Sequence, residues 1–577
     1  MYRLQNGFKD SLRPRFALLY GDEHFDHLME RLALVADRYS HLCPRSNETK
    51  EVWDEKSCLL ITYGDMIMDD KEAPLSVLSR FVVDYLKPEI SDIHILPFFP
   101  YSSDDGFSVI DYRTVDQDLG SWDDIKTMGE DFGLMFDLVI NHVSRQSNWF
   151  QDYLASIAPA RNYFIEMEAG VDLSLVTRPR TSPLLSEAQT VSGTRYVWST
   201  FSEDQIDLNY ANPDLLLEMI DILLSYIHRG VRIIRLDAIA YLWKEVGTNC
   251  INLPQTHEIV KLLRDVVEYV APGTVLLTET NLPHEENISY FGDGDEAHMV
   301  YQFSLPPLLL HTLQSGSAVH LTGWAAGLVP PSKGCTYLNF TASHDGIGVR
   351  PLEGLLDSVE IAALVDKVRE CSGLVSSRVM GDGEEVPYEL NITYFDALRQ
   401  VNGEDDSELH IARFLCSQAI MLSLQGVPAI YFHSLFGSSN NLSGVEETGR
   451  NRVINRARFD DGFLREMIAD EATVIGRVFK RYKELLNKRR SHPGFHPDVP
   501  QQVITCLEDN LFGLVRNVTN GDNLVCLFNV GATVHTIDLA VIGNYTNNNL
   551  NFFDMMAGKG VAETVRLGPY GFCWLTF

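Results

Sequence analysis

Long apolar runs are missing from this sequence of 577 residues. No stretch approaches the ~18 consecutive apolar residues that a membrane-spanning helix requires. The N-terminal sequence MYRLQNGFKDSLRPRF also lacks the apolar core of a signal peptide. We therefore expect a cytoplasmic protein that has no membrane partner.

Paired cysteines and glycine-rich phosphate loops are missing as well. The nine cysteines are dispersed and include no CxxC pair, which is typical of reduced thiols in a cytoplasmic protein. No GxGxxG or GxxxxGK(S/T) loop follows a predicted strand, which disfavours nucleotide binding. No group of Asp and Asn residues has the spacing of a calcium loop. We expect neither a metal ion nor another cofactor.

Basic residues are scarce relative to acidic ones. The chain has 47 Lys and Arg against 79 Asp and Glu, a net charge of −32. Such a surface repels nucleic acid and anionic lipid, so we expect neither as a partner. Two explanations stay open, namely solubility alone and adaptation to high ionic strength. A monomer and a homodimer are both compatible with the sequence.

Strand and helix patterns alternate from about residue 59 to residue 433. Short apolar runs predict strands in CLLITYGD, ISDIHILPFFP, GLMFDLVINH, GVRIIRLD, GTVLLTET, CTYLNFTAS and GVPAIYF. Amphipathic runs such as LSVLSRFVVDYL predict helices between them. Repeated strand–helix units favour an α/β fold with a parallel sheet. Their number favours a closed (β/α)8 TIM barrel over an open sheet.

Two segments interrupt this alternation, and the pattern changes near the C-terminus. VTRPRTSPLLSEAQTVSGTR is rich in Pro, Ser and Thr, and VMGDGEEVPYEL is acidic and bears glycines. Long excursions within compact domains are usually functional. Beyond residue 500, short alternating runs with Asn/Gly turns predict an antiparallel β domain. The predicted parts are a helical extension (1–54), the barrel (55–146, 203–351 and 392–497), an inserted domain (147–202), a second inserted loop region (352–391) and the C-terminal β domain (498–577).

Polar residues gather where four of the predicted strands end. They are Asn141 with His142, Arg235 with Asp237, Glu279, and His344 with Asp345. A single carboxylate at a strand end is more often a helix cap than a catalyst. Reactive groups of (β/α)8 barrels lie at the carboxyl ends of the strands. Four such strand ends together therefore predict one active site.

Paired carboxylates suit the cleavage of a glycosidic bond, in which one attacks the anomeric carbon and the other protonates the leaving oxygen. Arg235 lies two residues before Asp237 on the same strand face, and a guanidinium favours an ionised carboxylate. Glu279 has uncharged neighbours in LLTET, which raise the pKa of a carboxyl group. We expect Asp237 to be ionised at neutral pH and Glu279 to be protonated.

The strings DLVINH, VRIIRLD, LLTETN and TASHDG, in this order, resemble the four signature regions of the α-amylase clan, glycoside hydrolase family 13. The resemblance covers the barrel and the C-terminal domain. It implies a retaining double displacement with Asp237 as the nucleophile, Glu279 as the acid/base and Asp345 as the transition-state stabiliser. The supporting residues would be Arg235, His142 and His344.

Further strings resemble the sucrose phosphorylase subfamily, whose members transfer the glucosyl group to phosphate and release α-glucose 1-phosphate. They are RLDAIAYLWKEVGTNC, YQFSLPPLLLH, SHDGIGV and GVPAIYF. The resemblance implies phosphate binding by Arg180, which stands near Arg178 in TRPR, and by Tyr388 in VPYEL. An anion requires such a cationic recess. The implied glucosyl subsite consists of Asp104, Phe107, Phe201, Gln205, Tyr241 and Arg452.

Two departures from the subfamily concern the acceptor. Asn281 stands where the subfamily typically has His, and Glu389 stands where it typically has Gln. TETNLPHEENISYFGDGDEAHMVYQF resembles the branch that phosphorolyses glucosylglycerol, glucosylglycerate or sucrose 6-phosphate. Glu389, and Glu353 beside Arg350, would repel an anionic acceptor, whereas glycerol needs only hydroxyl partners.

Glucosylglycerol is therefore the expected substrate, and glycerol the released acceptor. This osmolyte would also suit a salt-adapted surface. Glucosylglycerate and sucrose 6-phosphate are the alternatives within the branch. A sucrose phosphorylase, or an α-glucosidase or transglucosidase of the same clan, is the alternative outside it.

Overall fold

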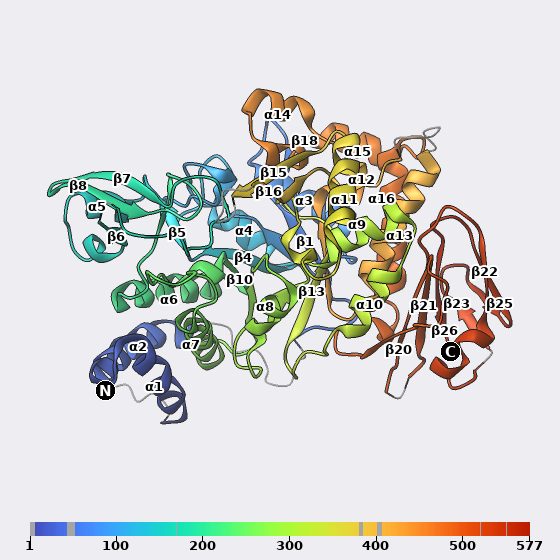
Figure 1. Ribbon diagram of the computed structural model, residues 1–577, viewed down its shortest axis with the longest axis horizontal. Helices are drawn as coiled ribbons and strands as arrows, with labels where there is room; N and C mark the ends of the chain where they lie inside the picture. Colours follow the sequence, from blue (N-terminus) through green and yellow to red (C-terminus); the bar gives the residue numbers. More distant parts are fainter. Residues whose placement is uncertain are drawn as a thin grey trace.

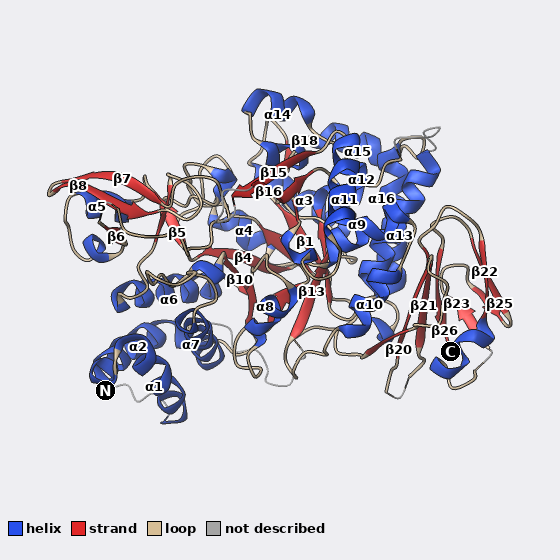
Figure 2. Ribbon diagram, viewed as in Figure 1, coloured by secondary structure: helices blue, strands red, loops and turns tan. Residues whose placement is uncertain are grey.

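The computed structural model describes residues 6–42, 52–168, 170–379, 385–400, 407–519, 521–549 and 551–577. The acidic, glycine-bearing stretch 380–384 of the second insertion lies outside these ranges. A closed barrel of eight parallel strands forms the centre of the molecule (Figures 1 and 2). The strands are β1 (Leu59–Thr62), β3 (Asp92–Ile95), β4 (Gly133–Val139), β10 (Val231–Asp237), β11 (Val275–Thr278), β12 (Met299–Tyr301), β13 (Thr336–Phe340) and β17 (Val427–Tyr431).

The barrel confirms the predicted fold class. The strands follow one another in chain order, and β17 closes on β1. Nearly every strand residue is buried, because helices cover the outside while side chains fill the inside, which explains the continuous apolar runs. The sequence pattern missed one strand, β12. Its three residues are too few to show any periodicity.

Helices on the outside of the barrel carry the chain from strand to strand. They are α3 (Pro74–Leu86), α4 (Trp122–Met128), α6 (Pro213–His228), α7 (Pro254–Val270), α8 (His284–Ile288), α9 (Leu305–Ser315), α10 (Val319–Gly327), α13 (Ser407–Ser423) and α16 (Val474–Arg489). The shorter helices α12 (Tyr394–Ala397), α14 (Leu442–Thr448) and α15 (Asp461–Ala469) lie in the upper part of Figure 1. Within the described ranges, no helix combines the length and the apolar character that crossing a membrane requires.

Two helices precede the barrel, α1 (Asn6–Tyr20) and α2 (Phe25–Ser40). They pack against α7 and α6, respectively (Figure 1). Buried Phe16 and Leu32 contribute to the same core as the barrel. Arg15 donates to Asp265 of α7 at 2.7 Å, so the extension is fixed by both apolar and polar contacts.

Two insertions lie at the barrel mouth. The first contains β5 (His142–Ser144), α5 (Asn148–Leu154), β6 (Glu166–Met167), β7 (Leu185–Thr190), β8 (Gly193–Trp198) and β9 (Gln205–Asp207). The second contains α11 (Ser358–Glu370) and an antiparallel sheet of the order β14 (Ile347–Gly348), β16 (Glu385–Asn391) and β15 (Leu374–Val379). The second insertion is thus more regular than a loop, and β16 brings Tyr388 and Glu389 to the mouth.

The C-terminal part is an antiparallel β domain with its own core (Figure 1). Buried Val525, Leu575 and Ile537 belong to that core. The larger sheet has the order β19 (Gln501–Val503), β20 (Leu511–Arg516), β21 (Leu524–Asn529), β26 (Phe572–Thr576), β23 (Phe552–Asp554) and β24 (Lys559–Val561). The smaller sheet pairs β22 (His535–Asp538) with β25 (Thr564–Leu567).

The loop after β3 depends on a glycine. Gly106 has a φ of +106°, and a Cβ atom there would lie 2.5 Å from the carbonyl oxygen of Pro97. Asp104 in the same loop also has a positive φ, 53°. This turn presents Asp104 and Phe107 to the cavity at the barrel mouth.

Gly106→Ala should therefore lower both stability and activity. We expect a loss of about 1–3 kcal/mol in the free energy of unfolding, because the substitution places a side chain on a residue with a positive φ and brings its Cβ atom against the backbone. Gly558→Ala is the matched control, since Gly558 has a φ of +65° but open space around its Cβ position. Urea unfolding midpoints and kcat would compare the two variants. Equal losses in both would contradict the role of the Pro97 contact.

Candidate active site

A cavity of about 720 Å3, its open mouth included, lies at the carboxyl ends of the barrel strands. The residues to which the family resemblance assigned a role line it, together with the two departures Asn281 and Glu389: Asp104, Phe107, His142, Arg180, Phe201, Gln205, Arg235, Asp237, Tyr241, Glu279, Asn281, His344, Asp345, Tyr388, Glu389 and Arg452. The remaining lining residues are Ala238, Ala240, Thr280 and Leu282. In the described part of the chain, no group of three His, Cys, Asp or Glu side chains is placed to hold a metal ion.

Arg235 is buried between two carboxylates. Side chains alternate along a strand, so β10 presents Arg235 and Asp237 on the same face. Arg235 Nη1 donates to Asp237 at 2.7 Å and to Asp137 of β4 at 2.5 Å, while His94 of β3 lies 2.7 Å from Asp137. The guanidinium thus orients Asp237. Asp137 and His94 were not predicted as site residues. The feature of the sequence that could have identified them is a charged or polar residue inside the apolar run of a strand.

Glu279 follows β11 and is linked to the turn after Asp237. Its Oε2 accepts a hydrogen bond from the backbone N–H of Ala238 at 2.9 Å. Ala238 has a φ of 51°, a left-handed conformation that costs about 1–2 kcal/mol in a residue with a side chain. The N–H of this left-handed residue therefore links Glu279 to the turn that follows Asp237.

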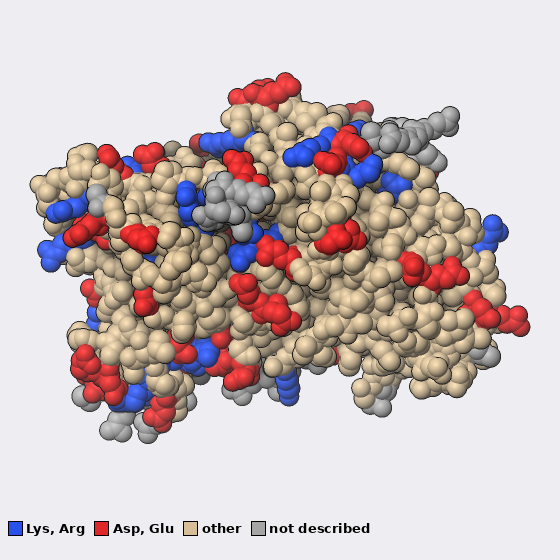
Figure 3. Space-filling model, in the orientation of Figure 1, with Lys and Arg blue, Asp and Glu red and all other residues tan. Residues whose placement is uncertain are grey.

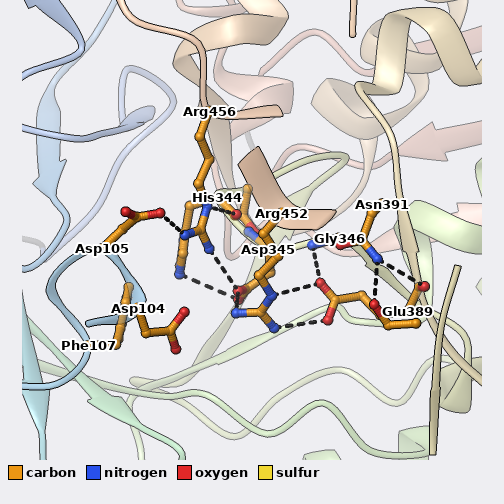
Figure 4. A network of polar contacts seen from close by, with 12 residues as sticks. Asp104, Asp105, Phe107, His344, Asp345, Gly346, Glu389, Asn391, Arg452 and Arg456 are labelled. Atoms are coloured by element: carbon orange, nitrogen blue, oxygen red, sulfur yellow. Dashed lines mark hydrogen bonds and ion pairs between the residues drawn. The ribbon is translucent and has the colours of Figure 1, made fainter. Parts of the chain in front are cut away.

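Arg452 lies between Asp345 and Glu389 (Figure 4). Its Nη1 lies 2.5 Å from Asp345 Oδ1, and its Nε and Nη2 donate to Glu389 at 3.0 and 2.9 Å. Burial raises the pKa of Asp345 and Glu389, but the neighbouring arginines outweigh burial and hold the pKa of both below its usual range. Both carboxylates are ionised at neutral pH.

A second buried arginine, Arg456, was not predicted. Its Nε donates to the carbonyl oxygen of His344 at 2.7 Å, its Nη1 pairs with Asp105, and its Nη2 lies 3.8 Å from Asp345 (Figure 4). Arg456 therefore ties the loop after β3 to the segment after β13. The sequence could have indicated this role, because Arg456 belongs to NRVINR, the string that also contains Arg452.

Phe107 and His344 form a stacked pair, with ring centroids 4.7 Å apart and planes 4° apart. His142 Nε2 lies 2.9 Å from the carbonyl oxygen of Phe107, and Gln205 Nε2 donates to the same oxygen at 3.3 Å. Burial lowers the pKa of both histidines. The cavity therefore presents neutral imidazoles and an aromatic face, which suit the hydroxyls and the apolar face of a sugar.

Lys244 is a further buried cation that sequence reasoning missed. Its Nζ lies 2.5 Å from Asp207 of β9 and donates to Asn141 at 2.6 Å. Asn141, predicted only as part of a strand end, is thereby connected to the first insertion. The lysine orients the insertion rather than lining the cavity.

Arg180 and Tyr388 meet across the cavity from the two insertions. The guanidinium carbon of Arg180 lies 5.9 Å from the centre of the Tyr388 ring, and its Nη1 lies 3.5 Å from Glu389. The nearby Arg178 instead donates to the backbone carbonyls of two following residues at 3.0 and 2.6 Å. Arg178 braces the loop, while Arg180 faces the cavity.

The acidic repulsion predicted on the acceptor side is wrong. Glu389 is neutralised by Arg452 and Arg180. Glu353 does not line the cavity and accepts a hydrogen bond from Arg378 at 2.8 Å. Arg350, its neighbour in the sequence, lies 3.7 Å from Glu286. No uncompensated carboxylate of this group repels an anion.

Comparisons with known proteins decide the family. Residues 82–324 match the family model of the α-amylase catalytic domain. Over 534 residues the chain is 47% identical to a glucosylglycerate phosphorylase from Allomeiothermus silvanus, which covers 92% of this chain and 94% of the relative. The chain belongs to the phosphorylases of the α-amylase family.

Two other members of this phosphorylase group are more distant. A glucosylglycerol phosphorylase from Marinobacter adhaerens is 30% identical, over 76% of this chain and 87% of the relative. The crystal structure of sucrose 6F-phosphate phosphorylase from Thermoanaerobacter thermosaccharolyticum has a TM-score of 0.72 and 25% identity, over 84% of this chain and 96% of that one. The predicted family is confirmed.

The protonation of this phosphorylase centre differs in one respect from the expectation. Burial raises the pKa of Asp237 to about 7 despite Arg235, and burial likewise raises the pKa of Glu279 to about 7, with Asp237 adding to the effect. The two carboxyl groups titrate as a pair. Because the Arg235 guanidinium donates directly to Asp237, we expect Asp237 to be the ionised member when the pair holds one proton.

The pair predicts a bell-shaped pH profile of kcat/KM centred near neutral pH. Activity falls at low pH as Asp237 gains a proton, and falls at high pH as Glu279 loses its proton. Glu279→Gln should reduce turnover of glucosides about 10²–10⁴-fold. It should largely spare α-glucosyl fluoride, whose leaving group needs no proton, and with this donor the alkaline limb should disappear.

Asp237→Asn is the matched variant. It removes the attacking group while keeping the shape of the side chain, so it should abolish turnover of both donors. Initial rates against pH would separate the two variants. Equal losses of Glu279→Gln on the glucoside and the fluoride would contradict a role of Glu279 as proton donor.

Proposed function

We propose that the enzyme is a glucosylglycerate phosphorylase, which reversibly converts an α-glucosylglycerate and inorganic phosphate into α-glucose 1-phosphate and glycerate. The observation that carries this proposal is the 47% identity along 92% of the chain to a glucosylglycerate phosphorylase. The glucosylglycerol phosphorylase from Marinobacter adhaerens, which has the activity that the sequence favoured, is only 30% identical to this chain.

Two displacements at the anomeric carbon would preserve its configuration. Asp237 attacks, the bond to glycerate breaks, and Glu279 gives its proton to the leaving oxygen. A phosphate oxygen then attacks the glucosyl–Asp237 ester, Glu279 takes back the phosphate proton, and Asp237 is released. Asp345, ionised between two arginines, is placed to stabilise the positive charge that develops on the sugar.

The charge pattern of the site supports an anionic acceptor. The argument for neutral glycerol rested on Glu389 and Glu353, and both carboxylates have arginine partners. Arg350, which does not itself line the cavity, is a candidate partner for a glycerate carboxylate. Its Nε is buried, without a hydrogen-bond partner in the described part of the chain. Burial raises the pKa of the cavity residue Tyr241, and the charge of Arg350 opposes that rise.

Acceptor competition in the reverse reaction tests the proposal. With α-glucose 1-phosphate as the donor, kcat/KM for glycerate should exceed that for glycerol and for fructose 6-phosphate by more than about tenfold, which is roughly 1.4 kcal/mol. Phosphate release would measure the rate. Glycerol or fructose 6-phosphate winning by the same margin would overturn the acceptor assignment but not the phosphorylase class.

Arg350→Gln extends the acceptor test to one side chain. If Arg350 pairs with the carboxylate, kcat/KM for glycerate should fall about tenfold or more while that for glycerol stays the same, because a charge-assisted hydrogen bond contributes about 1.5–3 kcal/mol. Glu353→Gln, which removes a charge that is paired with Arg378, is the control.

Arg180→Ala should weaken phosphate rather than the glucoside. Arg180 is the cavity cation proposed to bind phosphate with Tyr388, and the charged bonds it would form contribute about 1.5–3 kcal/mol. We expect at least about a tenfold rise in KM for phosphate, and hydrolysis should increase relative to phosphorolysis. Glucose and glucose 1-phosphate would be quantified together. Unchanged phosphate dependence would assign that role to another cation.

A further inference from the structure

A second cavity, of about 1010 Å3 with its open mouth, lies beside the active site. It adjoins the catalytic cavity, with which it shares five lining residues: Asp104, Arg180, Phe201, Gln205 and Arg452. We call it the arginine vestibule because four arginines line it, namely Arg180, Arg450, Arg452 and Arg456. Asp104 and Asp105 are its acidic lining residues.

The vestibule brings four arginines together on a strongly acidic protein, and three of them, Arg180, Arg452 and Arg456, have carboxylate partners. The chain has a net charge of −32, and on the face shown in Figure 3 acidic side chains are spread over the surface with basic ones among them. What distinguishes this opening is an exposed arginine, Arg450, beside three paired ones. Serine hydroxyls of Ser103, Ser202 and Ser376 add hydrogen-bonding groups to the lining.

Arg450 is the outermost of the four arginines. It lies between α14 and the 3₁₀ turn Asn451–Asn455, and it is exposed. Within the described ranges, no carboxylate comes close enough to Arg450 to form an ion pair, whereas Arg452 and Arg456 both have such partners. Deeper in, Arg456 Nη2 is buried and has no hydrogen-bond partner among the described residues.

We propose that the arginine vestibule is an oxyanion-binding antechamber in which Arg450 takes up inorganic phosphate before the phosphate reaches Arg180. The proposal rests on the proposed function in one respect, that phosphate is the second substrate. Arg450, Arg452 and Arg180 all line the vestibule, and Arg180 and Arg452 also line the catalytic cavity, so a phosphate ion would pass from the exposed guanidinium of Arg450 to that of Arg180. Arg450 acts in capture and does not contact the reacting atoms.

The physical need for such a site follows from the charge of the protein. A phosphate dianion that approaches a molecule of net charge −32 is repelled. An exposed arginine that has no ion-pair partner among the described residues offsets this repulsion locally, and charge of the right sign at a cleft raises association rates by roughly 10-fold or more. The effect is screened over about 10 Å at 0.1 M ionic strength.

Arg450→Ala tests the proposal in the full-length enzyme. α-Glucosyl fluoride would serve as an uncharged glucosyl donor and inorganic phosphate as the acceptor, so that no glycerate is needed. We expect kcat/KM for phosphate to fall about three- to tenfold at low ionic strength, and the loss to shrink as NaCl is added. Arg450→Lys keeps the charge and should retain most of the wild-type value.

Arg566→Ala is the matched control. Arg566 is also exposed but lies on β25 of the C-terminal domain, so it changes the net charge equally at a distant place. It should leave kcat/KM for phosphate unchanged. Hydrolysis of α-glucosyl fluoride without phosphate should respond to Arg450→Ala no more than to Arg566→Ala.

Three results would overturn the antechamber. The first is that Arg450→Ala and Arg566→Ala lower kcat/KM for phosphate equally. The second is that Arg450→Ala slows the hydrolysis of α-glucosyl fluoride without phosphate as much as it lowers kcat/KM for phosphate, and the third is that its effect on kcat/KM for phosphate does not depend on the salt concentration. A wild-type enzyme that releases glucose at the same rate with and without phosphate would instead overturn the phosphorylase function itself. The two failures are distinguishable because the second appears before any variant is made.

Discussion

The buried guanidinium of Arg235 is the interaction on which the centre of this barrel depends. Asp137 and Asp237 stand on adjacent strands, and Arg235 donates to both. Two carboxylates cannot remain ionised side by side in an apolar interior without a cation, and removing one partner of such a group costs about 3–5 kcal/mol. Asp237 is held in place in this way, and the N–H of the next residue positions Glu279.

The same pairing of arginine with carboxylate recurs around the barrel mouth and decides the acceptor argument. Arg452 separates Asp345 from Glu389, and Arg456 connects Asp105 to the segment that carries Asp345. Counting acidic residues in the sequence suggested repulsion of an anion. The geometry reverses that inference, because the positive charge of an arginine beside a carboxylate offsets the field of that carboxylate at a distance.

Much of the fold and of the cavity lining was predictable from the sequence for specific reasons. Buried parallel strands are continuous apolar runs, so seven of the barrel strands were evident, while the three residues of β12 were not. Residues at strand ends, such as Asp237, Glu279 and Asp345, converge on one mouth in any (β/α)8 barrel. The roles of Asp137, Lys244 and Arg456 were not predicted, because the residues that they pair with are distant in sequence.

The sequence by itself determined the barrel, the family and the residue types that line the cavity, since these follow from short-range periodicity and from motifs at strand ends. Only the tertiary structure decided which charges are compensated: Glu389 lies between Arg452 and Arg180, Glu353 pairs with Arg378, and Arg450 faces the vestibule. The physical reason is that electrostatic energy depends on distances between side chains and on their burial. Residues far apart along the chain acquire those distances only when the two insertions fold over the barrel mouth.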